Sequence, residues 1–391
     1  MAATPLAPIY LDHAATTPLR PEVAAAMDSA QAEAWGNPSS PHGVGRAAKR
    51  TLEDCRERIL GLLGCRSSGV GRDRLVFTSG ATEANRLAIL GMAAARTGIF
   101  ASSARDHSSI RSLRRELAGR GWGVAEIPLG ADGRVDATWT LPAPGNGLIA
   151  TTLVCGQSGA IDDPLRIAAA HPAALVHVDA TQAVLTQSVS FAELRCATLT
   201  LAPHKFAGPR GIGAVVVRGD VPFDAVVPGV QEAGLRGGTE PVVLVAGFLR
   251  ALELAVADRE RTAERLTALR ERFAAEFIAA AAGHGLAVRR IIDPVASSPH
   301  VLVLAVLGID RQAFVMAADL AGVCCGTGTA CASGSSEPAP ALAAMGLPPA
   351  LTGATLRFSF GRTTTAEEIT MAISRLAPLL LRLGTRGEVG R

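Results

Sequence analysis

The sequence contains very little lysine. Of its 38 basic side chains, only Lys49 and Lys205 are lysine, and the other 36 are arginine. An arginine guanidinium stays protonated in proteins, whereas a lysine amine can lose its proton and attack a carbonyl group. Lys49, in the run GRAAKR, needs no special explanation. For Lys205, in TLAPHKFAGPRGIGA, the neighbouring residues must show whether the site requires a nucleophilic amine.

Other scarce features exclude several classes of protein. No stretch reaches the ~20 apolar residues of a membrane-spanning helix, and the N-terminus lacks the basic and apolar segments of a signal peptide. The net charge is only +3, which gives no argument for nucleic acid or an acidic membrane as a partner. The seven cysteines include no CxxC pair and fit neither a disulfide framework nor a zinc module. We therefore expect a cytoplasmic protein with reduced thiols and no metal.

The order of apolar runs predicts a mostly parallel sheet covered by helices. Short runs rich in valine, isoleucine and leucine alternate with helical patterns over the first part of the chain; these runs are 74–80, 98–103, 147–154, 174–180, 197–202 and 211–219. The pattern is continuously helical from about 241 to 283. A smaller unit follows, with strands at 300–308 and 355–361 and helices at 310–322 and 366–383. At 391 residues the chain is long enough for two domains.

Polar residues cluster where four of these strands end, which is where open α/β sheets bind ligands. The first cluster, TSGATE at 78–83, begins a helix whose N-terminus could hold a phosphate, although such a turn is also an ordinary helix cap. The others are Asp106-His107, the run 179–182 (DATQ) and His204-Lys205. A histidine taken alone is more often a surface residue, whereas an acid at the end of an apolar strand needs a positive partner or several donors.

A phosphate site, an acid and a single lysine are together the parts required by pyridoxal phosphate. The motifs DATQ, HK with GPRGIGA, QEAGLRGGTEP and GTACASGSSEP resemble the cysteine desulfurase branch of the class V aminotransferases. YLDHAATTPLRPEV, GNPSSPHGVGR and LRFSFGRTTTAEEI extend the resemblance over nearly the whole chain. Several independent motifs in one order make it specific.

The resemblance implies the type I fold of the pyridoxal phosphate-dependent transferases. This α/β fold has a large domain with a mostly parallel seven-stranded sheet and a smaller α/β C-terminal domain. Residues 14–246 would form the large domain that binds the cofactor. Residues 1–13 and 247–391 would form the small domain, which carries the loop with the catalytic cysteine.

The resemblance also implies which residues surround the cofactor ring. Lys205 would bond covalently to the cofactor, and Asp179 would pair with the pyridine nitrogen. Gln182 would donate a hydrogen bond to the phenolic oxygen. His107 would stack on the ring and help to move protons.

The phosphate and the substrate would be held by a second set of residues. Ala81, Thr82 and His204 would bind the phosphate, and Thr239 would reach the phosphate of a neighbouring subunit, which implies a homodimer. Arg357 would clamp the carboxylate of the substrate, a task that suits a bidentate guanidinium; the alternative is an arginine that is merely paired on a strand. The resemblance adds Asn37 as a substrate-binding residue.

Cys331, in GTACASGSS, is by resemblance the sulfur acceptor. Such a residue needs a thiolate that can attack the sulfur of the substrate. Cys324 and Cys325 lie close before it, so a three-thiol metal site is the competing interpretation. Their spacing suits a metal poorly, and VCCGT also fits a buried strand in which cysteine is a small apolar residue.

Two positions depart from the pattern of the family. Gly156 stands where the family has an asparagine that contacts the phenolic oxygen and the substrate, and Ala202 stands where it has a phosphate-binding serine. Losing a hydrogen bond to a charged group costs about 1.5–3 kcal/mol, so the departures could weaken binding without abolishing it.

Three functions follow. The first is a cysteine desulfurase that converts L-cysteine to L-alanine and leaves a persulfide for sulfur transfer, in iron–sulfur cluster or thiocofactor supply, with a sulfur-acceptor or scaffold protein as partner. The second is another lyase or aminotransferase that uses the same cofactor, such as a selenocysteine lyase. The third is a catalytically impaired sulfur-transfer scaffold.

Overall fold

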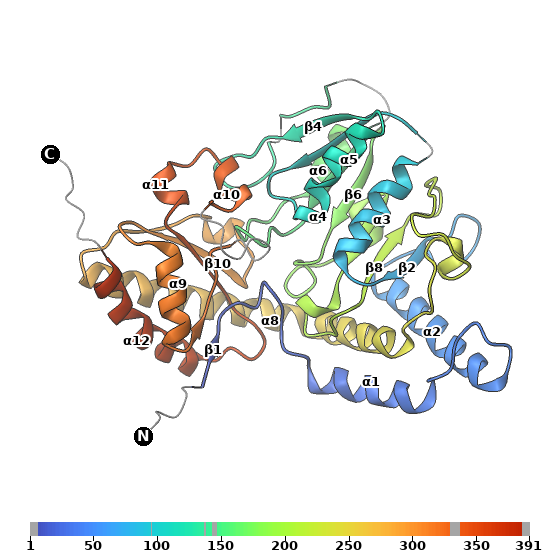
Figure 1. Cartoon of the computed structure of the whole chain (residues 1–391), viewed down its shortest axis with the longest axis horizontal. Coiled ribbons are helices and arrows are strands. Elements are labelled where there is room, and N and C mark those ends of the chain that lie inside the picture. The colour runs from blue at the N-terminus through green and yellow to red at the C-terminus, as the bar shows by residue number, and fades with distance from the viewer. Residues whose placement is uncertain (1–6, 95, 137, 143–146, 329–336, 385–391) are drawn as a thin grey trace.

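The chain folds around two β-structured cores joined by one long helix (Figure 1). The computed structural model describes residues 7–94, 96–136, 138–142, 147–328 and 337–384. None of the helices within these ranges is long and apolar enough to cross a membrane.

The larger core is a seven-stranded sheet with the strand order β2-β8-β7-β6-β5-β3-β4. Its strands are β2 (Arg74–Thr78), β3 (Ile99–Ser103), β4 (Gly123–Ile127), β5 (Gly147–Thr152), β6 (Leu175–Asp179), β7 (Thr198–Leu201) and β8 (Gly213–Val217). Neighbours pair in parallel except β8, which runs antiparallel to both β2 and β7. The prediction of a mostly parallel seven-stranded sheet is confirmed.

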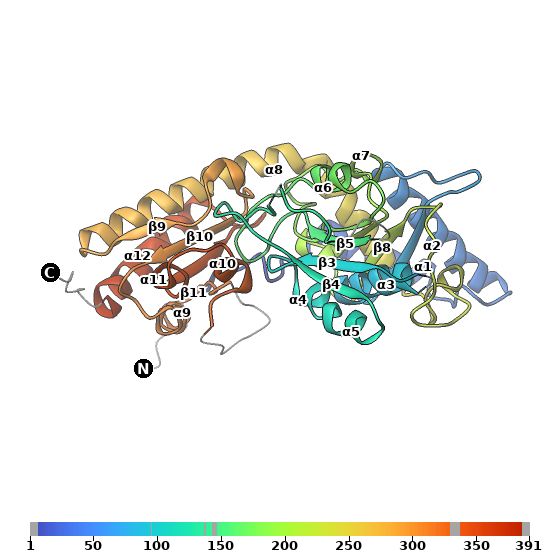
Figure 2. The ribbon, with the colours of Figure 1, turned by 90° about the horizontal axis from the view of Figure 1, so that it is seen from above.

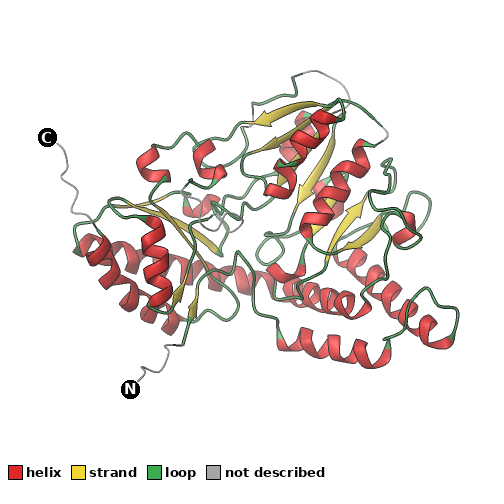
Figure 3. Cartoon of the chain, viewed as in Figure 1, coloured by secondary structure: helices red, strands yellow, loops and turns green. Residues whose placement is uncertain are grey.

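Helices cover both faces of this sheet, as the side-chain alternation of buried strands requires. Val215 and Val217 of β8 belong to a core with α3 (Ala81–Ala93) and α5 (Leu113–Gly119) on one face, whereas Val216 belongs to the core on the other face. That second core also includes α2 (Gly43–Leu62) and the first turns of α8 (Val242–Gly283). Figure 3 shows the strands between the two helical layers. The remaining helices of this part are α1 (Pro21–Glu33), α4 (Ser108–Arg111), α6 (Pro164–Ala170) and α7 (Phe191–Leu194), with the 3-10 turns η1 (Pro203–Lys205) and η2 (Glu232–Gly234).

The smaller core contains two short sheets. Strands β12 (Thr355–Ser359), β10 (Val301–Val306) and β9 (Val288–Arg290) form an antiparallel sheet, and β1 (Ile9–Tyr10) pairs in parallel with β11 (Val323–Cys324). The helices of this part are α9 (Arg311–Leu320), α10 (Pro340–Ala344), α11 (Pro349–Thr352) and α12 (Ala366–Leu383), with the 3-10 turn η3 (Pro294–Ala296).

Helix α8 is 42 residues long and connects the two cores (Figure 2). Its residues up to Ala255 pack into the core of the large sheet, and those from Leu266 onward pack with β10 and β12. The division at residues 13/14 and 246/247 stays a prediction, and its second boundary falls inside this continuous helix. The pairing of β1 with β11 supports the assignment of the N-terminal residues to the smaller part.

Candidate active site

The first part of the site is the turn between β2 and α3. Gly80 caps α3, so the backbone N–H groups of Ala81 and Thr82 lie in the first turn of a 13-residue helix, where an anion is favoured. Gly213 of β8 makes the turn possible, because a Cβ there would lie only 2.5 Å from the carbonyl carbon of Gly80. Ala81 is half-buried and Thr82 is exposed, so a ligand can reach both.

Asp179 is buried at the end of β6, and each of its carboxylate oxygens accepts a hydrogen bond from a described residue. Oδ1 accepts from the backbone N–H of Thr181 at 2.9 Å, and Oδ2 accepts from Nδ2 of Asn85 at 2.8 Å. These bonds satisfy the buried charge in part. They also hold the carboxylate in one orientation at the edge of the sheet.

Lys205 follows the neighbouring strand β7 and is held by the segment 12–17, which we call the N-terminal strap. Its Nζ donates to the carbonyl oxygens of Ala14 at 2.6 Å and Ala15 at 2.7 Å. The carbonyl oxygen of Ala14 also accepts from Nε2 of Gln182 at 2.7 Å, which brings Gln182 and Lys205 to one acceptor. The strap therefore binds residues that follow both β6 and β7.

Arg357 of β12 is the contribution of the smaller part to the site. Its Nη1 donates to the carbonyl oxygen of Gly156 at 2.8 Å, and its Nη2 pairs with Asp12 of the strap at 2.7 Å. The side chain is buried, and its Nε has no hydrogen-bond partner among the described residues. These two bonds use two of the five N–H groups of the guanidinium, so Nε and further N–H groups remain for a ligand at the junction of the two parts.

Gly156 has a structural counterpart in Gln182. A Cβ at residue 156 would lie 3.1 Å from Nε2 of Gln182, so the Gln182 amide occupies the side of the chain where an asparagine would project.

Two histidines flank the site. His107 caps α4, is exposed, and has Nδ1 2.9 Å from Oγ of Ser109, so its ring face is accessible. Nδ1 of His204 lies 3.1 Å from Oγ1 of Thr16 in the strap. Burial and the nearby charge of Lys205 lower the pKa of His204 to about 4, which keeps its imidazole neutral. A neutral ring that accepts from Thr16 carries its proton on Nε2 and can donate it to a ligand.

The chemistry of this edge fits a pyridoxal phosphate molecule. Besides Nε of Arg357, the buried hydroxyls of Thr181 and Thr200 have no hydrogen-bond partner among the described residues. Thr200 lies opposite Asp179 in the β6–β7 pairing, two residues before Ala202 and therefore on the same face of β7. A hydroxyl thus remains on this face although residue 202 provides none.

The structure does not bring every predicted residue together. Asn37 bonds within its own loop, where its Oδ1 accepts from the backbone N–H of Ser39 at 2.9 Å. That loop joins α1 to α2, which lie far from β10 and its partner β12 (Figure 1). Thr239 is exposed before α8. The roles of both residues stay predictions.

Cys331 lies outside the described residues. The chain that leads toward it passes Arg357, since Gly326 and Arg357 exchange backbone hydrogen bonds of 3.0 and 2.6 Å. A Cβ at Gly328 would lie 3.7 Å from the Cβ of Ala339, so the two flanks of the segment approach each other beside the site.

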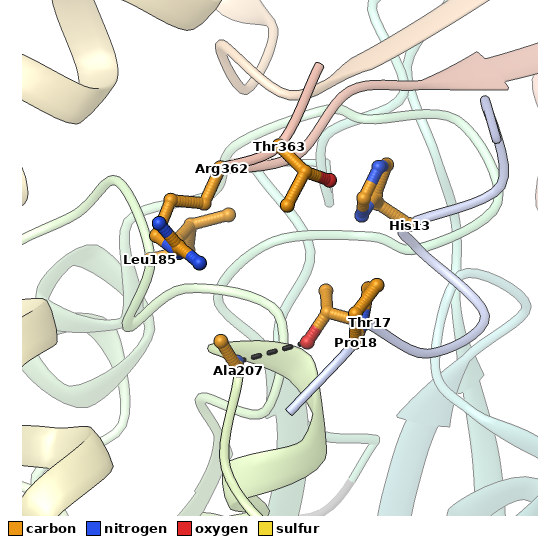
Figure 4. Close-up of a pocket in the computed structure, with 7 residues that line it drawn as sticks. All are labelled: His13, Thr17, Pro18, Leu185, Ala207, Arg362 and Thr363. Carbon is orange, nitrogen blue, oxygen red and sulfur yellow. Dashed lines mark hydrogen bonds between the residues drawn. The ribbon is translucent and has the colours of Figure 1, made fainter. Parts of the chain in front are cut away.

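A small pocket lies behind the lysine turn, where the strap meets the smaller part (Figure 4). The backbone N–H of Ala207 donates there to Oγ1 of Thr17 at 2.9 Å. The lining residues are His13, Thr17, Pro18, Leu185, Ala207, Arg362 and Thr363. None of them is a predicted site residue, so we assign no ligand to this pocket.

Sequence reasoning missed two residues of this arrangement. Asp12 is in the motif YLDHAATTP, but its contact with Arg357 joins positions 345 residues apart. Asn85 is a polar residue on the buried face of α3, which it shares with Ala84, Leu87 and Ala88. A buried amide in such a position requires polar partners, and this signal was available in the sequence.

Comparisons with known proteins agree with this geometry. Residues 9–371 match the family model described as aminotransferase class-V. The chain belongs to this family. Its members depend on pyridoxal phosphate, so the predicted cofactor is confirmed for the family, as are the resemblance and the type I fold.

Proteins that are similar to this chain bear related names. The chain is 36% identical to a cysteine desulfurase of Cereibacter sphaeroides over 98% of both chains. Among solved structures, a NifS-like protein superposes with a TM-score of 0.85 at 25% identity, covering 96% of this chain and 100% of that one. The structure of SspA in complex with cysteine gives a TM-score of 0.74 at 26% identity, covering 91% and 99%.

The buried histidines predict how stability depends on pH. Burial lowers the pKa of His13 and His177 to about 4 and that of His300 to about 3, whereas an unfolded histidine titrates near 6.5. The unfolded chain therefore binds more protons below pH 6.5, and the free energy of unfolding falls as the pH decreases from 6.5 toward 4. At pH 5 the loss is about 2 kcal/mol per buried histidine.

Urea unfolding followed by circular dichroism at pH 7, 6 and 5 measures this loss. Most carboxylates titrate below this range, which isolates the histidines. His204, whose pKa is also lowered to about 4, contributes in the same way, so His300→Gln, which keeps a polar side chain, should remove about a quarter of the pH dependence. A free energy of unfolding that is equal at pH 7 and pH 5 would show that these rings are not held neutral.

Proposed function

We propose that this chain is a pyridoxal phosphate-dependent cysteine desulfurase that converts L-cysteine to L-alanine and transfers the sulfur to Cys331. The observation that carries the proposal is the connected cluster at the sheet edge, in which the strap joins Lys205 to Gln182 and to Arg357. A lysine amine, a buried acid and an arginine are thereby gathered at one site. The names of the relatives support the same activity.

Each residue of the site has a task in this reaction. Bound pyridoxal phosphate supplies an electron sink for bond breaking at the amino acid. Arg357 binds the substrate carboxylate, and Asp179 holds the pyridine nitrogen in its protonated form. Lys205 would hold the cofactor through its Nζ, and this amine would serve to move protons at the substrate carbon atoms.

The sulfur-transfer step requires one thiol of the protein. The thiolate of Cys331 attacks the substrate sulfur, a new S–S bond forms, and the bond between Cβ and sulfur breaks. The products are alanine and a Cys331 persulfide, so no external oxidant or reductant is needed. His107, exposed next to the ring position, is placed to exchange a proton with the leaving sulfur.

An absorbance spectrum before and after addition of L-cysteine tests this function, with alanine and sulfide assayed together. We expect a yellow protein that releases one alanine for each sulfur transferred. A colourless protein that takes up no added pyridoxal phosphate would instead support the scaffold function. Gly156 motivates the other alternative, and a panel with L-selenocysteine and other amino acids separates a selenocysteine lyase or an aminotransferase from a desulfurase.

Arg357→Lys is expected to raise KM for L-cysteine by about 100-fold, because the shorter ammonium replaces a bidentate guanidinium with a single contact. The charge remains next to Asp12, and no described contact of Arg357 is to Lys205 or Asp179. The absorbance of bound pyridoxal phosphate should therefore stay as in the wild type. An unchanged KM would remove Arg357 from the substrate site.

We also propose a homodimer with shared sites. Thr239 is exposed, but its loop is held against the start of α3, where Arg236 pairs with Glu83 at 2.9 Å. The Thr239 hydroxyl lies at the edge of the phosphate site, where it suits a contact with the cofactor phosphate of a second copy of the chain. In the same dimer, Asn37 would bind the substrate in the site of the second copy. Sedimentation equilibrium of the holoenzyme tests this, since a monomer at micromolar concentration would contradict it.

The persulfide needs an acceptor. We propose a sulfur-acceptor or scaffold protein of iron–sulfur cluster or thiocofactor supply as the partner, in accordance with relatives named IscS and NifS. We place the protein in the cytoplasm, since the six described cysteines form no disulfide and a persulfide requires reduced thiols.

A further inference from the structure

Asn85 is completely buried on α3, among apolar neighbours, and uses its amide group in three directions. Nδ2 donates to Oδ2 of Asp179 at 2.8 Å and to Oγ of Ser109 at 3.0 Å. Oδ1 lies 3.0 Å from Nε2 of His177. A buried amide is costly unless it is paired, and this one has partners for both its N–H groups and its oxygen.

The direction of each of these hydrogen bonds can be deduced step by step, starting from Asp179. An ionised Asp179 can only accept, so Nδ2 of Asn85 must face it and Oδ1 must face His177. Burial lowers the pKa of His177 to about 4, so its ring is neutral, and the proton that meets Oδ1 lies on Nε2. Nδ1 is then an acceptor, and the hydroxyl of Thr198, 2.9 Å away, donates to it.

The result is a one-way chain of donors that runs from Thr198 through His177 and Asn85 to Asp179. A protonated Asp179 could not donate to Nδ2, which has no lone pair to accept. Nδ2 of Asn85 can therefore only donate to Asp179, and this hydrogen bond fixes the orientation of the carboxyl group. All four side chains are buried, and hydrogen bonds are stronger in a region of low dielectric.

We propose that Asn85 is a positioning residue that holds the carboxyl group of Asp179 in the orientation that faces the pyridine nitrogen of the cofactor. This inference rests on the proposed function only through the cofactor. Its second N–H group extends the effect, because Ser109 connects Asn85 to Nδ1 of His107, 2.9 Å from Oγ. Asn85 thus positions both Asp179, which would face the pyridine nitrogen, and His107, which would stack on the cofactor ring.

Asn85→Asp tests the proposal most directly. The variant places two carboxylates in contact, and since they cannot both ionise at low cost, they share a proton. We expect the dissociation constant for pyridoxal phosphate to rise about 10- to 100-fold. We also expect the spectrum of the bound cofactor to show a pH-dependent transition between pH 5 and 9 that the wild type lacks. Asn85→Ala should weaken binding without adding that transition.

Two threonine variants provide a matched comparison. Thr198→Val removes the first donor of the chain, whereas Thr151→Val removes a buried hydroxyl on β5 that has no partner among the described residues. We expect Thr198→Val to weaken cofactor binding several-fold and Thr151→Val to leave it unchanged. Thermal unfolding of the apoproteins reports any loss of folding, and the threonine pair remains informative if the Asn85 variants do not fold.

Wild-type affinity together with a wild-type pH profile in Asn85→Asp would overturn the proposal, and so would equal effects of the two threonine variants. These measurements contain no L-cysteine. If the Asn85 variants show the expected changes in cofactor affinity and pH profile but the wild-type protein releases no sulfide from L-cysteine, this inference stands and the proposed function does not.

Discussion

Lys205→Ala is expected to bleach the protein and to lower kcat/KM for L-cysteine by at least about 10⁴-fold, because removing the group that bonds to the reacting centre typically has effects of this size. Arginine cannot replace it, since a guanidinium does not lose its proton. Absorbance of the protein after reconstitution with pyridoxal phosphate, together with the rate of sulfide release, measures both effects.

Lys49 provides the matched control, because it is the only other lysine of the chain and is exposed on α2. Lys49→Ala should keep the colour and the full rate. Lys205→Ala also removes the hydrogen bonds from Nζ to the carbonyl oxygens of Ala14 and Ala15 in the strap, so the folding of the variant must be checked. Circular dichroism of Lys205→Ala should match the wild type, and a coloured, active Lys205→Ala protein would remove the lysine from the mechanism.

The fold was predictable to the extent that it depends on buried runs. The six apolar runs of the sequence correspond to β2, β3, β5, β6, β7 and β8. Strand β4 was not recognised, because it is an edge strand whose residues Gly123–Glu126 are mostly exposed, so it has no apolar run to detect. The antiparallel direction of β8 was also not visible, since a buried strand has the same pattern in either direction.

The site was predictable wherever a residue lies at a strand end. Asp179 and Lys205 end or follow adjacent parallel strands, so the order of the motifs already implied that they lie at one edge. The strap contacts were not predictable in this way. Asp12 meets Arg357, and Ala14 meets Lys205, only because the segment after β1 crosses from the small sheet to the large one. No local pattern records such a crossing.

Asn85 illustrates the same limit from within a helix. Its neighbours in sequence give the burial, but its partners Asp179 and His177 are 94 and 92 residues away. The sequence therefore shows that a buried amide must be satisfied, and only the structure shows that the acid of the site satisfies it.

Cys331→Ala is expected to keep the visible colour and the affinity for pyridoxal phosphate while lowering sulfide release from L-cysteine by at least about 10³-fold. The thiolate is the nucleophile of the sulfur-transfer step, and alanine offers no atom that can accept sulfur. The Arg357 backbone pairs with Gly326 on the segment that leads to this residue, so the chain is close to the substrate carboxylate site. Absorbance and sulfide assays on the same preparation separate cofactor binding from turnover.

Cys324→Ala and Cys325→Ala are the controls for thiol chemistry near the site. Burial raises the pKa of both thiols, to about 12 for Cys325, so neither forms a thiolate readily at neutral pH. Both variants should retain most of the activity. If Cys325→Ala stopped sulfide release and Cys331→Ala did not, the sulfur acceptor would be the residue next to Gly326, and the transfer would occur beside Arg357 without any contribution from residue 331.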